Sequence, residues 1–201
     1  MPKRSSILPN SDLQHATLRL SMSLSSLAMP NVAQFAKALY ALHQVGCLKD
    51  PRCRPAVGMF VRQATETTHW HLTTDYRSKR AAEELSKVSL RSPKHYHAWC
   101  RKNLRHEHMV PISEVIDMLV REPNVTEDFI ASTLRRNGLR ATIHRDEDAT
   151  LSKMGLGKRM PASFWHQGSP YFQDPLARYK EADLYKDLVK RTRESWYLNE
   201  G

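Results

Sequence analysis

Apolar residues recur along most of this chain at the spacing of three and four that is typical of amphipathic helices. The clearest stripe consists of Val32, Phe35, Ala36, Leu39 and Tyr40. Asn31 is placed to cap this helix and Gly46 is placed to end it. The same spacing predicts further helices at about 55–67, 77–88, 92–103, 112–121 and 126–137, and a basic helix at about 175–197.

Other segments depart from the helical spacing. The stretches Leu18 to Leu24 and Ala141 to His144 are strand candidates, and the polar segment before Pro111 is interpreted as extended. Residues 160–175 carry three prolines and several aromatic side chains, so we expect a packed irregular segment there.

No internal repeat, low-complexity tract or linker divides the sequence. We therefore expect a mainly α fold with a minor α+β component, in which a flexible N-terminus at 1–11 precedes a single helical domain at 12–201. Two or three short strands are expected around 105–112 and 140–145. A chain of 201 residues can bury a core without disulfide or metal support.

The charge balance favours a polyanionic partner. There are 31 Lys and Arg residues against 21 Asp and Glu residues, which gives a net charge of +10. Such a surface gains affinity when it releases counterions from phosphates, so nucleic acid is the expected partner and an acidic protein surface is the alternative. The residues expected to contact nucleic acid are Arg101, Lys102, Arg105, Arg135, Arg136, Arg140, Lys158, Arg159, Lys190 and Arg191.

The same composition indicates a cytoplasmic protein without a membrane partner. The mean hydropathy is -0.59, and no apolar run approaches the roughly 18–20 residues of a membrane-spanning helix. Polar residues interrupt the stretch from Ile7 to Met29, which argues against a signal peptide. Three cysteines without a Cys-x-x-Cys pair are expected to be reduced.

The segment His106-Glu107-His108 concentrates more chemistry than any other part of the sequence. In an extended segment, His106 and His108 share one face and Glu107 lies on the other. The piece Glu107-His108-Met109-Val110-Pro111 resembles the opening strand of the His-Asn-His (HNH) family of ββα-metal nucleases. The resemblance covers this segment alone, since an amphipathic helix follows directly where that family has a hairpin or loop.

The resemblance implies that Glu107 binds a divalent ion, Mg²⁺ or Mn²⁺, and that His108 is the general base that activates water. Further metal ligands are expected from His106, and from His144 and Glu147 if the chain returns to the cluster. Loss of activity is expected below about pH 6, where an ordinary imidazole becomes protonated.

Two functions of different classes follow. The first is a divergent metal-dependent nuclease with Glu107 and His108 at its centre. The alternative is a non-enzymatic basic helical protein, of phage or mobile-element type, that docks on nucleic acid or blocks another macromolecule. In that case the cluster only orients the chain before the helix at Ile112, and Glu107 pairs with a nearby arginine.

The remaining histidine pairs and aromatic residues have simpler interpretations. His95 and His97 lie in an expected helix, where residues two apart diverge, and the His69/His71 pair flanks Trp70 in a segment without a clear pattern. The aromatic segment at 164–172 either packs into the core, which we favour, or offers a stacking surface for single-stranded nucleic acid. We expect Trp165 and Phe172 to be structural, so Trp165→Ala should lower stability by about 3–5 kcal/mol.

Overall fold

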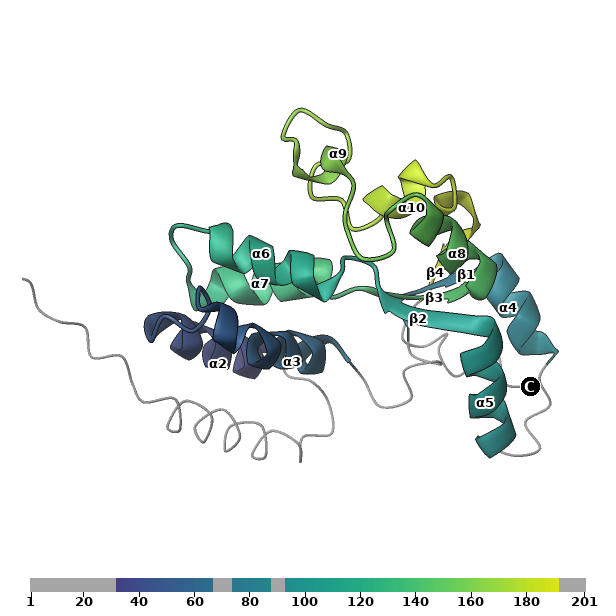
Figure 1. The fold of residues 1–201 in the computed structure, drawn as a ribbon, viewed down its shortest axis with the longest axis horizontal. Coiled ribbons are helices and arrows are strands. Elements are labelled where there is room, and N and C mark those ends of the chain that lie inside the picture. The colour runs from purple at the N-terminus through teal and green to yellow at the C-terminus, as the bar shows by residue number, and fades with distance from the viewer. Residues whose placement is uncertain (1–31, 67–73, 88–92, 192–201) are drawn as a thin grey trace, which may run out of the picture.

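The computed structural model describes residues 32–66, 74–87 and 93–191, without the side chains of 93–97 (Figure 1). The helices are α2 (Val32–Gln44), η1 (Pro51–Cys53), α3 (Arg54–Thr65), α4 (Lys79–Ser86), α5 (Pro93–Asn103), α6 (Ile112–Arg121), α7 (Glu127–Asn137), α8 (Arg145–Lys153), α9 (Ala162–Trp165), α10 (Ala177–Glu181) and η2 (Tyr185–Asp187). The strands are β1 (Tyr76–Ser78), β2 (Leu104–His108), β3 (Arg140–His144) and β4 (Leu188–Lys190).

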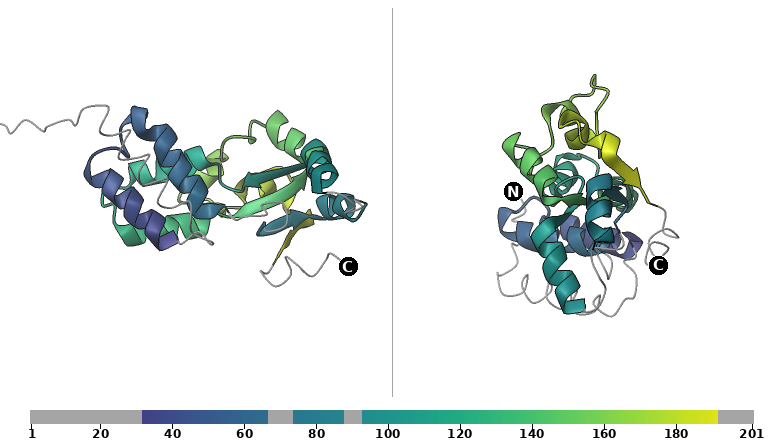
Figure 2. Two further views of the ribbon diagram at one scale, coloured as in Figure 1. Left: turned by 90° about the horizontal axis from the view of Figure 1, so that it is seen from below. Right: turned by 90° about the vertical axis from the view of Figure 1, so that its right-hand side faces the viewer.

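These elements form two halves along the long axis of the molecule (Figure 1). Helices α2, α3, α6 and α7 gather at one end and are called the helical half below. The strands, with α4, α5, α8 and α10, gather at the other end and are called the sheet half. The turned views confirm this separation, and the segment that carries α9 lies beside α6 and α7 (Figure 2).

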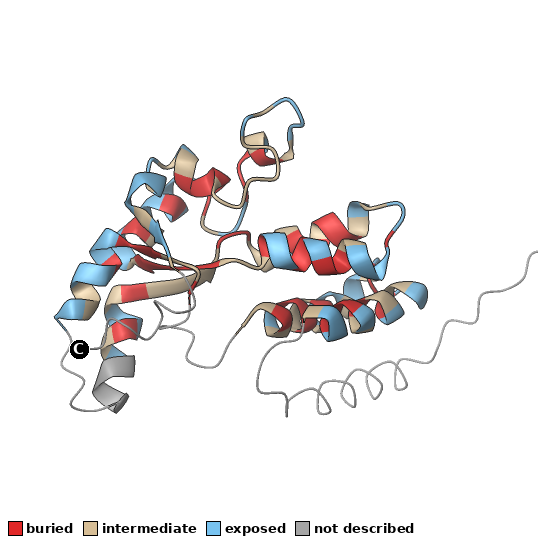
Figure 3. Cartoon of the chain, turned by 180° about the vertical axis from the view of Figure 1, so that it is seen from behind, coloured by how far each residue is buried: buried red, intermediate tan, exposed pale blue. Residues whose placement is uncertain are grey.

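The helical half is built on the apolar stripes that the sequence predicts. Buried positions lie on the facing sides of its four helices, and exposed positions lie outside (Figure 3). Its core includes Phe35, Leu39, Phe60, Val115, Ile116, Leu119, Ile130 and Leu134. Thr126 is the N-cap of α7, because its side chain accepts a hydrogen bond from the backbone N–H of Phe129 at 3.1 Å.

The sheet half contains a small mixed sheet in the order β2-β3-β1-β4. β2 and β3 are antiparallel, with Leu104 opposite His144 and His108 opposite Arg140. β1 runs parallel to β3 and antiparallel to β4. The apolar core on this side is small, and its buried members are Met109, Ala141, Ile143, Leu151, Leu156 and Tyr179.

The predicted fold class is confirmed, because helices dominate and short strands lie at 104–108 and 140–144. The helices predicted from 32 to 65 and from 93 to 137 are present within two residues of their expected ends. Residues 1–11 and the strand candidate at 18–24 lie outside the described residues. Along the stretches that the structure describes, no helix has the length and apolarity needed to cross a bilayer.

The helix predicted at 77–88 is present as α4, within two residues of its expected ends, and residues 76–78 form β1, which pairs with β3. One prediction about the sheet half was wrong. The helix expected over 175–197 is short: α10 ends at Glu181, Asp183 has a positive φ of 54°, and 188–190 form β4. Helix α8 had not been expected, and residues 192–197 lie outside the described residues.

Candidate functional site

Strand β2 places His106 and His108 on one face of the sheet and directs the carboxylate of Glu107 to the other. His106 Nδ1 lies 2.9 Å from Thr142 Oγ1, and His108 Nε2 lies 2.7 Å from Thr65 Oγ1 at the end of α3. The histidine side opens into a cleft of about 270 Å³, which Arg62, Glu66, Glu107 and Arg140 also line. The alternation predicted for an extended segment is therefore present.

The Glu107 carboxylate is held by the C-terminal part of the sheet half. Its Oε1 lies 2.8 Å from Arg178 Nη2 and accepts a hydrogen bond from the Tyr179 hydroxyl. Arg178 is 1% exposed, and its guanidinium also donates to the carbonyl oxygens of His108 at 2.7 Å and Leu156 at 3.2 Å. Burial raises the pKa of Glu107, whereas Arg178 and the Tyr179 hydroxyl act in the opposite direction.

The surroundings of His108 keep its imidazole neutral. Burial lowers the pKa of His108 to about 4, and the positive charges of Arg140, Arg62 and Arg178 act in the same direction. A group with this pKa is a weak base at neutral pH, whereas general bases work best with a pKa near the operating pH. The imidazole of His108 is therefore expected to become protonated, and to stop acting as a base, near pH 4 rather than below about pH 6.

His144 and Glu147 do not return to the cluster, contrary to the prediction. His144 is opposite Leu104, four residues along β3 from the partner of His108, a separation of about 13 Å. Both residues cap α8: Asp146 N–H donates to His144 Nδ1 at 3.2 Å, and His144 N–H donates to Glu147 Oε2 at 2.7 Å. Ser78 Oγ donates to the same carboxylate oxygen at 2.7 Å.

The predicted metal ligands therefore do not fit a shared divalent ion. The carboxylate of Glu107 points away from His106 and His108 and is already engaged by Arg178. Over the described ranges, no group of three or more His, Cys, Asp or Glu side chains could hold a metal ion. The His69/His71 pair lies outside those ranges, and His95 and His97 lie on α5.

Most of the cations expected to contact nucleic acid are exposed. The exposed ones are Arg101, Lys102, Arg135, Arg136, Lys158, Arg159 and Lys190. Two expected contacts are corrected. Arg140 is buried beside His108. Arg105 is half-buried and pairs with Asp148 at 3.2 Å. Arg191 is half-buried at the sheet edge, where its backbone N–H bonds the Asp75 carbonyl, and its contact with nucleic acid stays a prediction.

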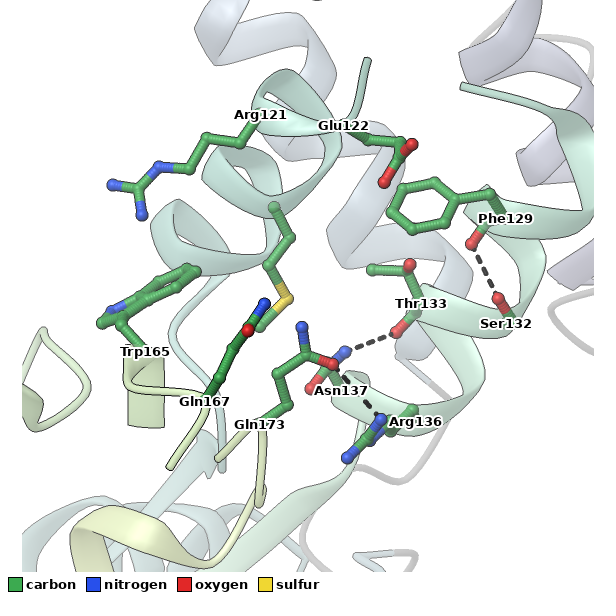
Figure 4. Close-up of a pocket in the computed structure, with 11 residues that line it drawn as sticks. Arg121, Glu122, Phe129, Ser132, Thr133, Arg136, Asn137, Trp165, Gln167 and Gln173 are labelled. Atoms are coloured by element: carbon green, nitrogen blue, oxygen red, sulfur yellow. Dashed lines mark hydrogen bonds between the residues drawn. The ribbon is translucent and has the colours of Figure 1, made fainter. Parts of the chain in front are cut away.

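The aromatic segment divides into a buried part and an accessible part. Phe164 is fully buried, whereas Trp165 is half-buried, with the Arg121 guanidinium 4.4 Å from its ring centroid. Trp165 also lines an open cleft of about 510 Å³ between α6, α7 and the segment after α9 (Figure 4). A loss of about 3–5 kcal/mol is therefore expected for Phe164→Ala, because Phe164 is fully buried. A smaller loss is expected for Trp165→Ala.

Sequence reasoning missed most of this second cleft. Its polar lining includes the amides of Asn137, Gln167 and Gln173, which stand in no recognisable motif. Two signals pointed to it: Arg136, which was among the expected nucleic-acid contacts, and the aromatic, proline-rich segment from 160 to 175.

Comparison with known proteins identifies no related protein. No family model matches the chain, and neither the curated proteins nor the solved structures include a significant match.

Proposed function

We propose that this protein is a non-catalytic nucleic-acid-binding protein. The observation that carries the proposal is a group of cations at the junction of α5, β2 and α8, called the basic corner below. Its members are Arg101, Lys102 and Arg145, and the half-buried Arg105, which pairs with Asp148, supports them.

Backbone contacts hold the basic corner together. Arg145 Nη1 donates to the carbonyl oxygen of Lys102 at 3.4 Å, and Arg105 Nη1 donates to that of Arg101 at 3.1 Å. Arg101, Lys102 and Arg145 are exposed, and within the described part of the chain their side chains form no salt bridge. Closely spaced cations without carboxylate partners are suited to contact successive phosphates of a nucleic acid.

Nucleic-acid binding has better physical support than cleavage. Binding requires only the net charge of +10 and the exposed cations, and it requires no metal ligand. Cleavage would need a base at His108, whose pKa is about 4, and a ligand at Glu107, which is bonded to Arg178. Helix α6 begins directly after Pro111, so the cluster also serves as the entry to that helix.

A salt titration tests the proposal. Binding of a labelled duplex would be followed by fluorescence anisotropy at several salt concentrations, with wild type and the double variant Arg101→Ala/Lys102→Ala. Each lost phosphate contact should reduce the log–log slope by about 0.9, so the double variant should lose about 2. The matched control is Lys37→Ala/Lys49→Ala, which removes two exposed cations elsewhere and should leave the slope near the wild-type value.

The absence of binding at low salt would overturn the proposal, as would an equal loss in the two double variants. The same samples also test the nuclease hypothesis, which stays a prediction. Strand shortening with Mg²⁺ or Mn²⁺ that disappears in His108→Ala, with binding retained, would replace binding alone by catalysis.

A further inference from the structure

The open cleft between α6, α7 and the segment after α9 has the size of a small-molecule site. Its volume of about 510 Å³ lies within the range of roughly 300–1,000 Å³ for ligand pockets. Figure 4 shows Trp165 and Arg121 on one side, Phe129 and Thr133 on the other, and Gln167 and Gln173 between them. None of these residues belongs to the β2 cluster or to the basic corner.

The walls of this cleft are fixed by contacts beneath them. Phe164 is buried and meets the Trp165 ring edge-on, with the two centroids 5.0 Å apart. Gln173 adopts a positive φ of 49°, its backbone N–H bonds the Phe164 carbonyl at 2.9 Å, and its side-chain oxygen accepts from Arg136 Nη1 at 3.3 Å. Conformations that most residues avoid persist where surrounding contacts hold them, and they concentrate at binding sites.

Asn137 gives the cleft a buried acceptor that requires a donor. Its side chain is 3% exposed and lines the cleft, and its Nδ2 donates to the Thr133 carbonyl at 3.1 Å. Its Oδ1 is buried and has no hydrogen-bond partner among the described residues. An unsatisfied buried acceptor costs about 1–3 kcal/mol, so a ligand donor that reaches Oδ1 on entering the cleft would remove this cost.

The lining combines the groups that recognise a nucleobase. The primary amides of Asn137, Gln167 and Gln173 can both donate and accept, as the edge of a base requires. Trp165 offers an aromatic ring for stacking, while Arg121 and Arg136 bring positive charge for the phosphates on either side. Glu122 is the one acidic residue among the lining residues.

From these contacts we propose that the cleft binds an unstacked base of single-stranded nucleic acid. A base within a duplex is paired and stacked, so it cannot enter without being extruded. This inference rests on the proposed nucleic-acid binding and adds to it the substrate class, which is single strands. The basic corner supplies charge-dependent affinity for any nucleic acid, whereas the cleft makes the protein prefer single strands.

Two adjacent arginines on α7 provide a matched test. Arg135 and Arg136 are both exposed, and their replacement changes the net charge equally, but only Arg136 lines the cleft and bonds Gln173. Dissociation constants would be measured for a labelled 12-nucleotide single strand and for the duplex of the same sequence. The variants would be Arg135→Ala, Arg136→Ala, Trp165→Leu and Gln167→Ala.

We expect Arg135→Ala to weaken single-strand and duplex binding by the same small factor. Arg136→Ala, Trp165→Leu and Gln167→Ala should weaken single-strand binding selectively, with the largest loss, about 5–150-fold, for Trp165→Leu. Gln167 is exposed, so its variant tests the cleft even if Trp165→Leu unfolds.

Three results would overturn the inference. Wild type could bind the duplex as tightly as the single strand, or the cleft variants could match Arg135→Ala on both ligands. In these two cases the proposed binding function would stand without the base site. Failure to bind either ligand at low salt would remove both proposals together.

Discussion

In the helical half, the fully buried side chains are apolar ones such as Leu39 and Phe60, whereas the largest buried side chain of the sheet half is Arg178. The apolar residues of the helical half pack against one another across four helices. In the sheet half, Arg178 joins Glu107 and Tyr179 to the backbone of β2 and of the turn after α8. One half therefore depends on apolar packing and the other on a few specific polar contacts.

This difference determines how each half responds to substitution. An apolar core loses stability in proportion to the volume removed, and neighbouring side chains relax partly into the space. A buried ion pair behaves differently, because removal of one partner leaves the other charged and without its counter-ion where solvent access is low. Removal of both partners is then less harmful than removal of one.

The largest expected effect is that of Arg178→Met, which keeps much of the side-chain volume and removes the guanidinium. We expect a loss of about 3–5 kcal/mol in the free energy of unfolding, because Glu107 then lacks its cation. Urea denaturation at neutral pH would measure it. Adding Glu107→Gln should restore part of the loss.

Leu39→Ala in the helical half is the contrasting control, with an expected cost of about 2–5 kcal/mol and no single second change that restores it. If Arg178→Met costs less than about 1 kcal/mol, or if Glu107→Gln makes it worse, the ionic account of the sheet half is wrong.

The same contrast explains which parts of the fold could be predicted from the sequence. The stripes of α2 and α6 are periodic, so their ends were predicted to within two residues. Helix α8 has no such stripe, since its only buried residues are Glu147 and Leu151, and a cap made by His144 and Glu147 begins it. The short strands β1 and β4 are three residues each, and they exist because they pair with distant partners.

The candidate site was predictable only in its local geometry. That His106 and His108 share a face follows from the strand alone, and the structure agrees. The partner of Glu107 was not predictable, because Arg178 is far along the chain in a segment expected to be a long helix. The register of β2 against β3, which separates His144 from His108, likewise depends on tertiary pairing.

His108 lies on the border of the two halves, since β2 carries it and its Nε2 meets Thr65 of α3. Its pKa is about 4 in the folded protein and near 6.5 in an unfolded chain. Between these values only the unfolded state binds the proton, so stability is full above about pH 6.5 and falls as the pH drops toward 4. We expect a contribution of about 2–3 kcal/mol to this loss.

Chemical denaturation of wild type and His108→Gln at pH 7.0, 5.5 and 4.5 would isolate this contribution. Glutamine can still hydrogen-bond Thr65 but does not titrate, so its stability should fall less steeply than that of wild type. If the free energies of unfolding of the two proteins fall equally with pH, the titration of His108 does not contribute to the pH dependence of stability.

The smallest expected effects come from two helix caps that share the same local chemistry. Thr126 in the helical half and Ser78 in the sheet half both accept a hydrogen bond from the backbone N–H three residues later. Thr126 is exposed, whereas Ser78 is 1% exposed and its hydroxyl also donates to Glu147. Thr126→Ala should therefore cost about 1 kcal/mol, the usual value for a lost cap. Ser78→Ala should cost about 2 kcal/mol, because a buried carboxylate also loses a donor.

A double-mutant cycle with Glu147→Gln separates the two contributions of Ser78. If the carboxylate accounts for the difference, Ser78→Ala should cost less on the Glu147→Gln background, close to the 1 kcal/mol of Thr126→Ala. Equal costs for Thr126→Ala and Ser78→Ala in the wild-type background would contradict the comparison at its most local level. The hydrogen bond from Ser78 to the buried carboxylate of Glu147 would then add nothing to the stability of the cap. The two halves would differ in the composition of their cores but not in the strength of their helix caps.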